Sequence, residues 1–100
     1  MSYIRVLVLV PIEKEQVLIT ALKQVDVLSM HVQKVKGYCC TPNFYSHDWA
    51  AEINKFEIFI GEHDLDGVKK VLKDVCFTGA EDDGVIAVSS LIELEKIANL

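Results

Sequence analysis

The order of apolar patterns along the chain constrains its fold more than any other feature of the sequence. Residues 3–10, YIRVLVLV, are aliphatic and β-branched with Arg5 as the one charge, a pattern typical of a central β-strand. Residues 13–24 instead space their apolar side chains as an amphipathic helix does. The remaining patterns predict strands at 28–36, 54–61 and 84–88, a helix at 64–76 and a terminal helical turn at 91–99.

This βαββαβ order predicts an α+β fold of the ferredoxin-like type, an antiparallel sheet with both helices on one face. We expect one domain spanning residues 1–100, since a chain of 100 residues matches a common domain size. The second sheet face would lack a helical cover, and Phe59 lies on that side of its strand. With 51% hydrophobic residues, a chain of this size has more apolar side chains than it can bury in its own core, so we expect a homo-oligomer.

Composition and charge exclude several classes of protein. The formal net charge is −5 and Lys and Arg form no cluster, which argues against nucleic acid as a partner. Pro11 interrupts the first apolar run and acids follow it, unlike a signal peptide, and no run approaches the roughly 18 apolar residues of a membrane span. Three cysteines, two of them adjacent, do not form a disulfide framework. We therefore expect a cytoplasmic location.

The segment 37–53 is the longest predicted to be irregular, and loops beyond about 12–15 residues are usually functional or disordered. It carries several aromatic residues, so we interpret it as a binding loop rather than a linker. Phe44, Tyr45 and Trp49 are candidates for anchoring a partner protein. The alternative is that these side chains fold the loop back onto its own subunit.

The same loop holds Cys39, Cys40 and His47, whose thiolates and imidazole are plausible ligands for Cu or Zn. Adjacent cysteines do not easily bind one tetrahedral ion, so the alternative is that all three are incidental surface residues. Cys76 lies on the apolar stripe of the second helix and is expected in the core. No nucleophile with a paired general base emerges, and we expect no enzyme activity.

Several motifs together resemble the PII signalling family: KVKGY, the long loop, KFEIFI, FTG and DDGVIAV. The family's second signature loop reads Thr-Gly-x-x-Gly-Asp-Gly-Lys. In the sequence FTGAEDDGVIAV, at residues 77–88, Asp82 stands at the middle glycine and Val85 at the lysine. Residues that match the family pattern, and that the resemblance therefore assigns to nucleotide binding, are Gly37, Lys55, Thr78, Gly79, Asp83 and Gly84.

The resemblance implies a homotrimer that is not a catalyst. Its subunit clefts would bind an adenine nucleotide (ATP, ADP or AMP), often with 2-oxoglutarate or another small effector. Its loop at 37–53 would dock on a transporter, an enzyme or a regulatory protein. Three departures stand out: the loop is short and lacks the modified-tyrosine context, residues 91–100 contain no Arg, and the phosphate loop has lost its Lys and gained acids.

The motif NFYSHDW at residues 43–49 resembles a divergent PII-like group with a shortened loop, whose genes lie beside heavy-metal and other cation efflux systems. This favours a regulator of transport, with a metal-sensing trimer that uses Cys39, Cys40 and His47 as the alternative. Extra carboxylates near a phosphate oppose its binding, so we expect triphosphates to bind weakly. Glu81 and Asp82 either face solvent, or the ligand is less charged, such as a mononucleotide, or arrives with a cation.

Overall fold

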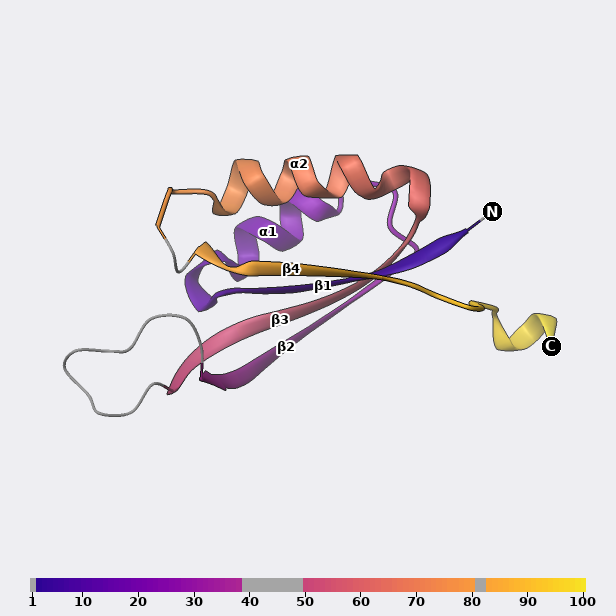
Figure 1. Cartoon of the computed structure of the whole chain (residues 1–100), viewed down its shortest axis with the longest axis horizontal. Coiled ribbons are helices and arrows are strands. Elements are labelled where there is room, and N and C mark those ends of the chain that lie inside the picture. The colour runs from indigo at the N-terminus through magenta and orange to yellow at the C-terminus, as the bar shows by residue number, and fades with distance from the viewer. Residues whose placement is uncertain (1, 39–49, 81–82) are drawn as a thin grey trace.

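The computed structural model describes residues 2–38, 50–80 and 83–100. They form a four-stranded antiparallel sheet in the order β2-β3-β1-β4, with both helices on one face (Figure 1). The ferredoxin-like prediction is confirmed. The elements are β1 (Tyr3–Pro11), α1 (Glu15–Leu22), β2 (Ser29–Tyr38), β3 (Ala50–Gly61), α2 (Leu65–Cys76) and β4 (Val85–Ser90), with 3-10 turns at Ile12–Lys14, Glu62–Asp64 and Ile97–Asn99.

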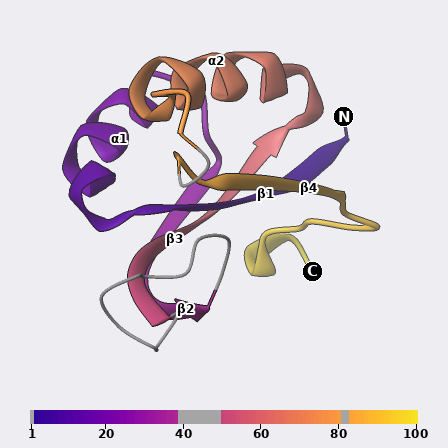
Figure 2. The same cartoon turned by 60° about the vertical axis from the view of Figure 1, so that its left-hand side comes forward.

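The core lies between the two central strands and the helices, as the second view shows (Figure 2). Strand side chains alternate between faces, so every second residue of β1 and β3 points toward the helices. Phe56, Ile58 and Ile60 are fully buried, as the alternation predicted. The helices contribute Leu18, Leu22, Val68, Leu72 and Cys76 to the same core.

Two details of the helices differ from what the sequence pattern alone indicates. Val17, one of the apolar residues in the helical pattern at 13–24, is 59% exposed, because the helix turns Leu18 and Leu22 toward the sheet instead. Asp64, the first residue of the helix predicted at 64–76, occupies the N-cap position of α2, but its carboxylate makes no capping hydrogen bond. Its Oδ2 instead lies 3.2 Å from Nε2 of His63.

The predicted loop at 37–53 is wrong at both ends, because the β2–β3 ladder continues into it. Gly37 pairs with Ala51 and Tyr38 with Ala50, so the two strands satisfy each other's backbone groups in this stretch. The remaining segment, 39–49, lies outside the described residues. So do the proposed metal ligands and aromatic anchors in it: Cys39, Cys40, His47, Phe44, Tyr45 and Trp49.

The terminal helical turn predicted within 91–99 is present but short: a single 3-10 turn spans Ile97–Asn99, and residues 91–96 have no helical structure. Ile92 and Leu100 are exposed, and helices in proteins are stabilised mainly by packing one apolar face. The segment leaves the end of the sheet opposite the α2–β4 loop (Figure 1). Among the described residues, no helix is long and apolar enough to cross a membrane.

The sheet face away from the helices has no cover within the described chain. Leu7, Leu9 and Phe59 are half-buried there, and Val85 is 50% exposed. Glu57 lies on the same face, opposite Leu7. Its carboxylate accepts a 2.8 Å hydrogen bond from Nε of Arg5 and lies 3.4 Å from Nδ1 of His31, because those cross-strand neighbours share its face. The Arg5 bond is the main cause that lowers the pKa of Glu57.

Candidate functional site

The segment between α2 and β4 is folded around the carboxylate of Asp83. Its Oδ2 accepts hydrogen bonds from the backbone N–H groups of Thr78, at 2.7 Å, and Gly79, at 3.0 Å. The Thr78 hydroxyl donates to Oδ1, and the Ala80 N–H donates to that hydroxyl oxygen at 3.3 Å. The structure therefore brings together Thr78, Gly79 and Asp83, three residues that the sequence assigned to ligand binding.

These bonds hold Asp83 in its charged form. They lower its pKa, and the Thr78 hydroxyl is the largest cause, followed by the Thr78 backbone N–H. The charge of Lys14 acts in the same direction. The carboxylate is thus occupied in closing the loop, and part of its negative charge is compensated by these donors. Glu81 and Asp82 lie outside the described residues.

Glycine is required at the end of this loop. Gly84 has a φ of +128°, and a Cβ atom there would lie 2.4 Å from the carbonyl oxygen of Leu9. Gly79 also has a positive φ, of +90°, but a Cβ there would meet no atom within 4 Å. Gly84 therefore lets the loop backbone approach β1 closely, whereas Gly79 supplies only the turn.

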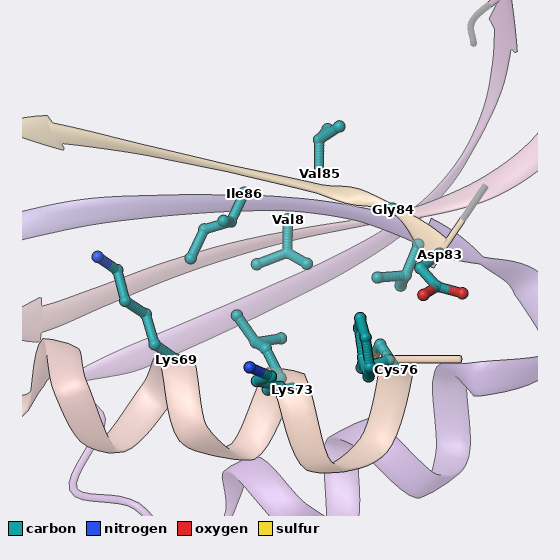
Figure 3. A pocket seen from close by; sticks show the side chains of 11 residues that line it. Val8, Lys69, Lys73, Cys76, Asp83, Gly84, Val85 and Ile86 are labelled. Atoms are coloured by element: carbon teal, nitrogen blue, oxygen red, sulfur yellow. The ribbon is translucent and has the colours of Figure 1, made fainter. Parts of the chain in front are cut away.

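A groove of about 320 Å³ opens between α2, β4 and this loop (Figure 3). It exists because β4 is an edge strand that α2 does not cover, which leaves Ile86 40% exposed on the helix side. The walls are largely apolar and the loop closes one end with Asp83 and Gly84. The wall residues are Val8, Val10, Leu72, Cys76, Phe77 and Ile86, with Lys69 and Lys73 from α2. Val85 also borders the groove, but its side chain points away from α2, toward the other sheet face (Figure 3).

The buried residues of the groove differ in chemistry from its rim. Cys76 is 7% exposed, which confirms its predicted place in the core, and this burial raises the pKa of its thiol. At the rim, Phe77 is 64% exposed and its ring lies 5.4 Å from Nζ of Lys73. The groove thus has an apolar floor, a cationic side on α2 and an aromatic ring near the loop.

Gly37 and Lys55 lie apart from this groove. Lys55 is opposite Leu9, which is opposite Val85, so all three form one row on the sheet face away from the helices. Gly37 is farther along, paired with Ala51 near the end of the β2–β3 hairpin. Of the six residues proposed for nucleotide binding, the structure gathers four at the loop and leaves these two on β2 and β3.

Sequence reasoning missed Lys69, Lys73 and Phe77 as site residues. The spacing of 69, 73 and 77 is typical of residues that share one side of a helix, and this signal could have identified them. No group of three or more His, Cys, Asp or Glu side chains suited to a metal occurs within 2–38, 50–80 and 83–100.

Comparison with solved structures shows that the chain shares its fold with PII proteins, while no family model and no curated protein matches the chain. GlnK of B. subtilis in complex with ATP is 24% identical, with a TM-score of 0.74 over 90% of this chain and 82% of that one. Another B. subtilis GlnK structure is 22% identical, with a TM-score of 0.73 over 92% and 87%.

A plant protein gives a similar result. Arabidopsis thaliana PII bound to citrate is 19% identical, with a TM-score of 0.75 over 96% of this chain and 81% of that one. The alignment therefore covers nearly the whole chain in both comparisons, bacterial and plant. We conclude that the chain has the fold of the GlnK and PII proteins.

Replacing Gly84 by alanine should destabilise the protein far more than replacing Gly79. Both substitutions force a non-glycine residue to a positive φ, a cost of about 1–3 kcal/mol, but Gly84→Ala adds a clash with the Leu9 carbonyl. Urea denaturation of the two variants measures the difference. Equal losses of unfolding free energy would show that the close approach of the loop to β1 contributes nothing.

The Asp83 hydrogen bonds should make stability depend on acid pH. Because the folded-state pKa lies below the ordinary aspartate value of 3.8, this contribution is present above that value and is lost as the pH falls through the folded pKa. Asp83→Asn should therefore be less stable than the wild type at pH 7, with the gap closing as the pH falls below the ordinary aspartate value of 3.8. Asp74→Asn, which removes an exposed carboxylate from α2, is the control. A gap that is constant with pH would contradict this role.

Proposed function

We propose that the chain is a PII-like signalling protein, a homotrimer without catalytic activity that binds an adenine nucleotide at the groove beside the Thr78–Gly84 loop. One observation carries the proposal: the loop, closed by Asp83, borders an apolar groove on a fold shared with a GlnK–ATP complex. Family membership, nucleotide binding and the signalling role are parts of this proposal.

The uncovered sheet face supports self-association. Leu7, Leu9, Phe59 and Val85 present apolar surface there, and removing such surface from water contributes about 25 cal/mol per Å². Packing three copies through this face would bury it and would bring other subunits close to the grooves. The resulting clefts between subunits are where we place the nucleotide.

The groove favours a nucleotide of low charge. Val85 stands where the resembling loop has a lysine, so the loop itself supplies no cation to a long polyphosphate. Its backbone N–H groups at Thr78 and Gly79 are already bonded to Asp83. We therefore expect AMP or ADP to bind as well as ATP, and all three weakly compared with sites that surround phosphates with basic residues.

We propose that the protein signals by binding a partner through the segment that joins β2 and β3. Phe44, Tyr45 and Trp49 in it would contact a cytoplasmic face of a transporter or the transporter's regulator. The chain would act as one domain, residues 1–100, in the cytoplasm. Nucleotide binding in the groove would change the affinity of the protein for this partner.

Sedimentation velocity and calorimetry test the proposal together. The purified chain should sediment as a trimer, and titration with AMP, ADP and ATP, with and without Mg²⁺, should give saturable heats. Thr78→Val should weaken nucleotide binding by roughly two- to tenfold, since the hydroxyl's hydrogen bonds to Asp83 and from the Ala80 N–H, which organise the loop, are lost.

Thr20→Val is the matched control, because the Thr20 hydroxyl donates to its own helix, at the carbonyl of Gln16, away from the groove. It should bind nucleotides as the wild type does. A monomer in solution, or a trimer that gives no heat with any of the three nucleotides, would remove the proposal.

A further inference from the structure

We propose that Lys69 and Lys73 form the anion-binding side of the groove, which takes a ligand with a flat apolar ring system and one compact anionic group. The inference rests on the proposed function, in that it assigns the charge and ligand class of the same site. Mononucleotides and other aryl anions belong to this class. The phosphate or carboxylate would bind on α2 rather than in the Thr78–Gly84 loop.

The placement of the lysines on α2 is the first argument. Lys69, Lys70 and Lys73 are all exposed, but only Lys69 and Lys73 line the groove, because residues four apart share a helix face. Lys69 rises from α2 toward β4 beside the cavity, and Lys73 lies one turn closer to the loop (Figure 3). Two ammonium groups thus stand next to a groove whose other walls are largely apolar.

The distribution of charge within the groove is the second argument. Its one described carboxylate, Asp83, lies at the loop end and is bonded to Thr78 and Gly79. The loop position that could offer a cation is occupied by Val85. Among the described residues, the net attraction for an anion is therefore at the lysines.

The apolar part of the groove fits the other half of such a ligand. Val8, Leu72 and Ile86 present aliphatic side chains to the cavity. Phe77 is 64% exposed, and its ring lies within cation–π distance of Lys73, with Nζ 5.4 Å from the ring centroid. An aromatic ring stacked on Phe77 would be buried on one side by these aliphatic groups and would hold its anionic substituent near Lys73.

The test compares three full-length proteins: wild type, Lys69→Gln/Lys73→Gln and Lys70→Gln. Calorimetry measures AMP binding, and fluorescence measures 8-anilinonaphthalene-1-sulfonate, an aryl anion unrelated to nucleotides. The double variant should bind both probes at least tenfold more weakly, and Lys70→Gln should stay within twofold of wild type. AMP should displace the dye. Circular dichroism and sedimentation show that each variant keeps its fold and assembly.

The outcomes separate this inference from the proposed function. Equal AMP and dye affinities in all three proteins would overturn the role of Lys69 and Lys73, while nucleotide binding itself would stand. If the dye binds only when the lysines are present and AMP does not bind at all, the result would support the anion site and would rule out a nucleotide as its ligand. If wild type binds neither probe, the groove is closed by another part of the assembly, and both proposals fail.

Discussion

The close approach of Gly84 to the Leu9 carbonyl is the constraint on which the rest of the site depends. A Cβ atom at position 84 would lie 2.4 Å from that oxygen, so the loop can reach β1 only because no side chain is present. This approach fixes where β4 begins and sets Asp83 beside the edge of the sheet. There the Asp83 carboxylate accepts hydrogen bonds from the N–H groups of Thr78 and Gly79, and these bonds determine the shape of the loop.

The groove follows from topology rather than from a dedicated insertion. Two helices are packed on a four-stranded sheet, and β4 at its edge is left partly uncovered on the helix side. The uncovered strip is apolar, as expected for a strand whose inner face continues the core, and α2 adds two lysines along it. This chain shares its fold with a GlnK–ATP complex, and its groove carries two cationic side chains, Lys69 and Lys73, on helix α2.

The sequence correctly predicted those features of the fold that depend on local residue patterns. The alternation of Phe56, Ile58 and Ile60 identified the buried face of β3, and the Thr-Gly and Asp-Gly pairs identified the loop. It failed where partners distant in sequence decide the outcome. The extension of β2 rests on the pairing of Gly37 with Ala51, and the groove role of Lys69 and Lys73 appears only when β4 is placed beside α2.

The central claim is that this chain binds a small aryl anion in the α2–β4 groove. Amide chemical-shift mapping of the isotope-labelled protein during titration with AMP tests it most directly. The account predicts that the largest saturable shifts occur at Val8, along residues 69–76 of α2, in the segment 77–84 and at Val85 and Ile86 at the start of β4. Shifts confined to the opposite sheet face, at Leu7 and Phe59, or the absence of saturable shifts, would contradict it.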